Sequence, residues 1–161
     1  MDQTQDQHER ATGDEFVVWL NKETQSSFVF SSRGTPVPDL IYTDGTRVLG
    51  LEISSAYYDG AHAKFQWENA RGKSDAPSQW SGMNFETRLI QNISQVIKQK
   101  SQMTYGPDCC LVIFVRPNLT YYHEFIDLLQ SLVLPSIVPF TGVYILGYFP
   151  EGQYVIPIRA A

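Results

Sequence analysis

Hydrophobic positions along the chain recur with two different periods, which predict an alternation of helices and strands. Apolar residues three or four positions apart, the helical spacing, occur in residues 13–23, 84–104 and 121–132. Short apolar runs bounded by turn residues predict strands, and these cover residues 28–30, 40–42, 48–53, 109–115, 142–149 and 154–158. The order of helix, three strands, helix, strand, helix and two strands predicts an α/β fold with a central mixed β-sheet flanked by helices.

The first helix is preceded by a sequence that is typical of a helix start. Residues 12–15 read Thr-Gly-Asp-Glu, which has the Thr-x-x-Glu form of a capping box and comes just before an apolar group. We therefore expect the helix to begin near Gly13, or further back through His8 and Glu9. The polar residues 1–11 are expected to be a flexible segment.

A tight hairpin is predicted between the strands at 40–42 and 48–53. Residues 43–46 read Thr-Asp-Gly-Thr, and an Asp-Gly pair favours such a turn because glycine tolerates positive φ. A hairpin brings the start of its first strand beside the end of its second strand. Asp39 and Glu52 are therefore expected to lie close together, and a divalent cation is the usual way to relieve the repulsion between two such carboxylates.

The residues around this hairpin resemble a known family. Pro38-Asp39, followed after the hairpin by Glu52-Ile53-Ser54, is similar to the core of the PD-(D/E)XK nuclease superfamily, although Ser54 stands where the family pattern has lysine. The resemblance implies a restriction-endonuclease-like core over residues 15–146 and a metal-dependent nuclease that hydrolyses phosphodiester bonds. It also implies that Asp39, Glu52 and the backbone carbonyl of Ile53 hold Mg²⁺ or Mn²⁺.

The same resemblance implies a glutamate on the first helix that supports the metal site. Glu15 is the candidate and Glu9 is the alternative. Glu15 also fits the simpler interpretation of a helix-capping residue.

Lys100 is the candidate for the lysine that is missing at Ser54. At about 100° per residue it falls in the middle of the apolar face of the helix at 84–104, while Lys98 falls on the opposite side. A lysine on an apolar face needs a partner or must extend outward to water. Ile97, Lys100 and Tyr105 together resemble branches of the family in which the catalytic lysine comes from this helix. The alternative is a lysine that points to water near the negative end of the helix dipole.

Composition limits the remaining choices. The 161 residues, 43% of them hydrophobic, suit one domain over residues 12–161, with an irregular insertion at 56–81 that is long for a connection. Its aromatic and basic side chains are expected either to follow a nucleic-acid strand or to pack on the core. Cys109 and Cys110, the two cysteines, are expected to be buried free thiols. No apolar run of membrane-spanning length and no signal region is present, so we expect a cytoplasmic protein without a membrane partner.

Two alternatives to a nuclease stay open at this point. The net charge of −5 works against a broad nucleic-acid-binding surface, and together with Ser54 it favours an inactive nuclease-fold protein that binds or regulates. The second alternative is an α/β protein in which the two carboxylates are coincidental. For the nuclease, we expect DNA rather than RNA as the substrate, and a homodimer would suit the cutting of two strands.

Overall fold

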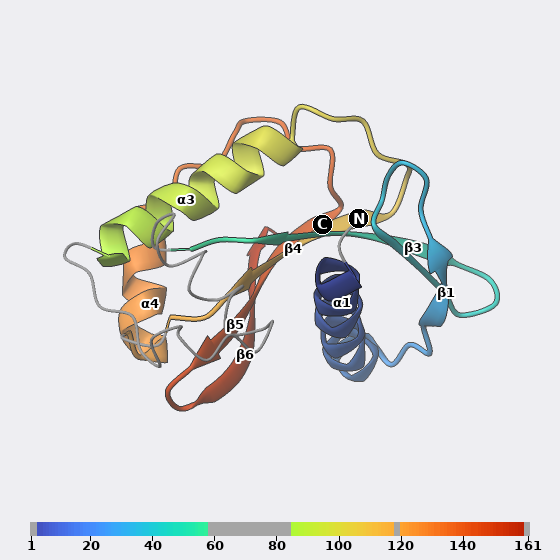
Figure 1. Cartoon of the computed structure of the whole chain (residues 1–161), viewed down its shortest axis with the longest axis horizontal. Helices are drawn as coiled ribbons and strands as arrows, with labels where there is room; N and C mark the ends of the chain where they lie inside the picture. Colours follow the sequence, from blue (N-terminus) through green and yellow to red (C-terminus); the bar gives the residue numbers. More distant parts are fainter. Residues whose placement is uncertain (1–2, 58–84, 118–119, 160–161) are drawn as a thin grey trace.

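In the computed structural model, residues 3–57, 85–117 and 120–159 are described, and they form three helices and six strands (Figure 1). The insertion expected at 56–81 lies outside these ranges apart from its first two residues. The elements, in chain order, are α1 (Gln3–Thr24), β1 (Val29–Arg33), β2 (Leu40–Thr43), β3 (Val48–Ser55), α3 (Phe85–Lys100), β4 (Cys109–Val115), α4 (Tyr122–Leu129), β5 (Gly142–Phe149) and β6 (Gly152–Arg159).

The six strands form one mixed sheet in which spatial order follows chain order, β1-β2-β3-β4-β5-β6. The pairs β1–β2, β2–β3 and β5–β6 are antiparallel, whereas β3–β4 and β4–β5 are parallel. The parallel pairs need crossover connections, and α3 and α4 lie within them. The expectation of an α/β fold with a mixed sheet flanked by helices is therefore confirmed.

Helices cover both faces of the sheet, so the central strands are apolar on both sides (Figure 1). In β4, Cys109, Leu111 and Ile113 pack with residues of α3 and α4, whereas Cys110 and Val112 pack with residues of α1. This alternation follows from the two-residue period of a strand. We refer to the two sides as the α3 face and the α1 face. Both cysteines are buried free thiols, as expected.

The hairpin between β2 and β3 has the predicted turn. Gly45 has a φ of +95°, a conformation that L side chains rarely adopt. The Asp44 carboxylate accepts hydrogen bonds from the backbone N–H groups of Thr46 and Arg47, at 3.0 and 2.8 Å. This turn sets the register in which Leu40 lies opposite Leu51, and that register positions the candidate site.

Of the two starts considered for the first helix, the one near Gly13 is wrong, and the extension back through His8 and Glu9 is confirmed. Helix α1 begins at Gln3 and is continuous to Thr24, so residues 3–11 are helical and Gly13 lies inside the helix. Thr12 and Gly13 are buried because they face the sheet, and a Cβ at Gly13 would lie only 2.8 Å from the Tyr42 hydroxyl. That hydroxyl donates to Asp14 at 2.7 Å. The small and polar residues of the Thr-x-x-Glu sequence thus allow close helix–sheet packing and do not cap the helix.

Helix α3 ends at Lys100, before the predicted limit at 104, because the following residues close the helix with tighter turns. The N–H groups of Gln102 and Met103 donate to the carbonyls of Gln99 and Lys100. Strand β6 is an edge strand, as expected from Pro157. Among the helices of the described ranges, none is both long and apolar enough to cross a membrane.

Candidate functional site

An ion pair between α3 and the middle of the sheet defines the candidate site. The Nζ of Lys100, in the last turn of α3, lies 2.6 Å from Oε1 of Glu52 on β3. The Glu52 side chain is only 3% exposed, and that of Lys100 is 29% exposed. A lysine on an apolar face was expected either to meet a partner or to extend to water, and the structure shows the first outcome, with Glu52 as the partner. Lys98, by contrast, is exposed on the other side of the helix.

Asp39 lies beside this pair. It comes directly before Leu40, and since Leu40 pairs with Leu51, Asp39 falls opposite Glu52 on the same face of the sheet. Its Oδ2 accepts a hydrogen bond from the Ile53 N–H at 2.8 Å. Burial raises the pKa of Asp39 to about 6; the Ile53 N–H and the Lys100 charge oppose this rise, while the charges of Glu52 and Glu9 add to it. Asp39 and Glu52 are therefore electrostatically coupled, as expected for two carboxylates at one site.

The backbone carbonyl of Ile53 is directed to the β2 side of β3. The N–H groups of Gly50 and Ala56 donate to carbonyls on the β4 side of β3, so even-numbered residues of β3 direct their peptide groups to β4. Odd-numbered residues direct theirs to the β2 side, and the Ile53 N–H does so when it donates to Asp39. Strand β2 begins at Leu40, opposite Leu51, so the Ile53 carbonyl lies beyond the end of the β2 ladder.

The Oε2 atom of Glu52 is buried and has no hydrogen-bond partner among the described residues. A buried carboxylate oxygen without a donor is costly, which indicates that another partner belongs there. Oxygen atoms of Asp39, Glu52 and the Ile53 carbonyl are the hard donors that Mg²⁺ and Mn²⁺ prefer, and Mg²⁺ is commonly held by one or two carboxylates with water in its other positions. Within residues 3–57, 85–117 and 120–159, no cluster of three or more His, Cys, Asp or Glu side chains could hold a metal. Asp39 and Glu52 are only two such side chains, so an ion at this point would rely on the Ile53 carbonyl and on water for its other ligands.

Of the two glutamates considered on the first helix, Glu9 is the one whose charge acts on Asp39. Glu9 is 5% exposed, and its Oε2 accepts from Arg33 at 3.0 Å. Glu15 is six residues further along α1, about 240° around the helix axis. It accepts hydrogen bonds from Tyr148 and Gln153 of the β5–β6 hairpin. The structure thus places the alternative candidate, Glu9, near the site and gives Glu15 a different set of contacts.

Arg33 was not anticipated from the sequence. It joins the surroundings of the site because β1 places it opposite Leu40, next to Asp39. Its guanidinium bonds Glu9 and also donates to the Asp6 carbonyl at 2.8 Å. No local signal marks this residue, because the contact depends on how α1 lies across the end of β1.

A hollow of about 410 Å³ opens near the start of β3. It lies over the β2–β3 hairpin and the connection that precedes β4, and Pro38, Gly50 and Cys109 line its inner end. Pro38 directly precedes Asp39, and the pKa of the Cys109 thiol, raised to about 12 mainly by burial, is raised further by the charges of Glu52 and Asp39. Neither Asp39 nor Glu52 lines the hollow, but its lining residues Pro38 and Gly50 lie within two residues of them along the chain.

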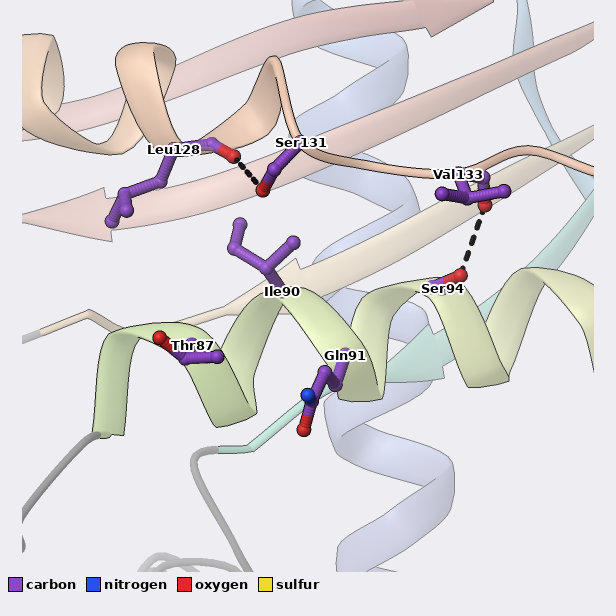
Figure 2. Close-up of a pocket in the computed structure, with 7 residues that line it drawn as sticks. All are labelled: Thr87, Ile90, Gln91, Ser94, Leu128, Ser131 and Val133. Atoms are coloured by element: carbon purple, nitrogen blue, oxygen red, sulfur yellow. Dashed lines mark hydrogen bonds between the residues drawn. The ribbon is translucent and has the colours of Figure 1, made fainter.

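A second hollow lies between α3 and α4, and Figure 2 shows seven residues that line it. The Ser94 hydroxyl donates to the Val133 carbonyl at 2.9 Å, and the Ser131 hydroxyl donates to the Leu128 carbonyl at 2.7 Å. The lining residues include no acid, base or thiol. The Ser94 bond holds the loop after α4 against α3, and the Ser131 bond closes the end of α4.

Comparison with known proteins yields no family model, curated protein or solved structure that matches the chain.

Proposed function

We propose that the protein is a metal-dependent nuclease that hydrolyses phosphodiester bonds of nucleic acid, with Asp39, Glu52 and Lys100 as its catalytic residues. One observation carries the proposal: the Lys100 ammonium lies 2.6 Å from Glu52 Oε1, while the second oxygen of Glu52 is buried and has no donor within the part of the chain that the structure describes. Two acids and one amine from three separate chain segments thus meet at one point of the sheet. The resemblance of Pro38-Asp39 and Glu52-Ile53-Ser54 to the PD-(D/E)XK pattern supports the same assignment.

The proposed chemistry assigns a role to each group. Asp39, Glu52 and the Ile53 carbonyl would hold Mg²⁺ or Mn²⁺, and Glu9 adds negative charge nearby. A bound divalent ion supplies Lewis-acid activation of water and neutralises charge on the phosphate. The Lys100 ammonium orients the attacking water or stabilises the negative charge that develops on the phosphate oxygens. The position of this cation in space matters for the chemistry, so a lysine on α3 takes the place of a lysine at residue 54 of β3.

The hollow beside Pro38 and Gly50 provides the approach for a substrate strand, and we propose DNA as the first substrate to test. The acidic net charge of the chain argues for a local contact with the backbone of the nucleic acid and against a broad basic surface. A homodimer for cutting both strands remains a prediction, which sedimentation with and without DNA tests.

An inactive relative that binds or regulates is the second candidate. The observation that favours it is the Lys100–Glu52 ion pair itself, because a carboxylate that is already neutralised by an internal ammonium needs no metal ion. In this case the same residues stabilise the fold and perform no hydrolysis.

The deciding experiment measures cleavage of supercoiled plasmid, single-stranded circular DNA and a labelled RNA with Mg²⁺, Mn²⁺ or EDTA. Four proteins are compared: the wild type, Asp39→Asn, Lys100→Met and the control Lys98→Met, whose lysine is exposed on the other side of α3. We expect metal-dependent cleavage that falls by about 10²-fold or more in Asp39→Asn and Lys100→Met. The Lys98→Met protein should keep the wild-type rate.

Each contrary result has a distinct meaning. Cleavage that survives Asp39→Asn would place the activity at another site. Calorimetric Mn²⁺ binding without cleavage of any substrate, or the absence of Mn²⁺ binding, would replace the nuclease with the inactive relative.

A further inference from the structure

Tyr105 carries a buried hydroxyl that the proposed mechanism does not use. It lies in the connection between α3 and β4, is 8% exposed and packs its ring against Phe140 with a centroid distance of 4.7 Å. Its hydroxyl is fully buried and has no hydrogen-bond partner among the described residues. A tyrosine that served only to fill the core would be better replaced by phenylalanine, because a buried hydroxyl without a partner costs free energy.

Among the described residues, neither the Tyr105 hydroxyl nor the second oxygen of Glu52 has a hydrogen-bond partner, and both side chains lie on the α3 face of the sheet. Tyr105 packs in the cluster on the α3 face that contains Cys109 and Leu111, and Leu111 is the direct neighbour of Glu52 across the β3–β4 pair. Burial raises the pKa of Tyr105, and the negative charge of Glu52 is the next cause. One of these atoms is a donor and the other is an acceptor, so each has what the other lacks.

We propose that the Tyr105 hydroxyl is a positioning group that donates to Glu52 Oε2 through one shared buried water, because the two atoms make no direct hydrogen bond with each other. Glu52 is then held from both sides, by the Lys100 ammonium on Oε1 and by the phenol on Oε2. Resting on the proposed function, this arrangement fixes the orientation of the Glu52 carboxylate toward the ion. Groups that orient a metal ligand in this way typically change metal affinity by about 10- to 100-fold when they are removed.

The first test uses stability alone, in EDTA. Tyr105→Phe should lower the midpoint of urea unfolding in the wild-type background, because it leaves Glu52 Oε2 without its donor. In a Glu52→Leu background, where the acceptor is gone, the same change should leave the midpoint unchanged or raise it. A midpoint that rises in both backgrounds would show that the two groups are not partners and would overturn the proposal.

The second test is the dissociation constant of Mn²⁺, measured by calorimetry. Tyr105→Phe should weaken Mn²⁺ binding by about tenfold or more. The control is Tyr144→Phe, which removes a hydroxyl from the α1 face, where Tyr144 packs against Phe16 and Trp19. This control should bind Mn²⁺ as the wild type does. Unchanged Mn²⁺ binding in Tyr105→Phe would overturn the positioning role.

The two tests also separate this proposal from the proposed function. Coupling between Tyr105 and Glu52 in the free energy of unfolding, in a protein that binds no metal, would support the link between the two residues and contradict the proposed nuclease function. Metal-dependent cleavage without coupling between the two residues would support the proposed nuclease function and contradict the positioning role of Tyr105.

Discussion

Replacing Lys100 by methionine should destabilise the protein far more than its position at the end of a helix suggests. The substitution keeps most of the apolar stem but removes the ammonium 2.6 Å from Glu52 Oε1. Since Glu52 is 3% exposed and its other oxygen has no partner among the described residues, the variant leaves a buried carboxylate with no counter-charge. Breaking a buried pair in this way costs about 3 to 5 kcal/mol. The 29% exposure of Lys100 admits some water, which sets the expectation at about 3 kcal/mol.

The assay is urea unfolding in EDTA at neutral pH, followed by far-UV circular dichroism and tryptophan fluorescence. Lys98→Met is the matched control because Lys98 is exposed on the same helix, and it should change the free energy of unfolding by less than about 0.5 kcal/mol. In a Glu52→Leu background, Lys100→Met should be nearly neutral, because an apolar pair of similar volume replaces the ion pair. The double-mutant cycle should therefore give a coupling of about 2 kcal/mol or more.

Two results would refute this reasoning. A cost for Lys100→Met no larger than that of the Lys98→Met control would mean that Glu52 is solvated or neutral without its partner. An equal cost in the wild-type and Glu52→Leu backgrounds would mean that Lys100 acts through packing alone.

Three further predictions concern the surroundings of the site. Gly45→Ala should lower the free energy of unfolding by about 1 kcal/mol because φ is +95° there. The control is Gly106→Ala, because a Cβ at Gly106 has no atom within 4 Å. It should change the free energy of unfolding by less than about 0.5 kcal/mol in the same urea assay. The pKa of Asp39 is raised from 3.8 to about 6, so in EDTA its protonation stabilises the wild type fully below about pH 4, and this contribution is lost as pH rises through 6. The urea midpoint of the wild type should therefore fall over this pH range, and Asp39→Asn should abolish the fall. Curves of urea midpoint against pH that superimpose for the two proteins would contradict the assignment. Glu9→Gln should weaken Mn²⁺ binding about fivefold in calorimetry, since it removes about 1 kcal/mol of attraction. Glu15→Gln should leave the affinity for Mn²⁺ unchanged. A larger loss of affinity in Glu15→Gln than in Glu9→Gln would show that Glu15 is the residue that supports the site.

The strands and the hairpin were predictable because their signals are local. The runs at 109–115 and 142–149 have the limits of β4 and β5, since a strand covered on both faces is apolar throughout and ends at turn residues. The Asp-Gly turn fixes which residues of β2 and β3 face each other, and this places Asp39 opposite Glu52. A partner for Lys100 was one of two expected outcomes, because a lysine on an apolar helical face either meets a partner or extends outward to water. Its catalytic role remains a proposal.

The start of α1 and the choice between Glu9 and Glu15 were not predictable, because both depend on how the helix lies on the sheet. A Thr-x-x-Glu sequence that caps a helix cannot be distinguished locally from one whose small residues face a neighbouring strand. The buried Gly13 beside Tyr42 decides in favour of the second case. Once the rotation of α1 is fixed by that contact, Glu9 falls near Asp39 and Glu15 falls near Tyr148.

The alternation along β3 makes the charged site a check on strand alignment. Glu52 faces Lys100, while Leu51 and Ile53 on either side of it face the apolar cluster under α1. A slip of one residue would exchange these sides. The Glu52 carboxylate would then be buried in the apolar cluster on the α1 face, and an apolar side chain such as Ile53 would lie against the Lys100 ammonium. Glu52 therefore destabilises a misaligned hairpin in two ways, because its carboxylate is buried among apolar side chains and Lys100 loses its partner. Proteins in which Glu52 and Lys100 are both replaced by apolar side chains can stay stable yet lose this discrimination, and doubled amide resonances for β2 and β3 would be its signature.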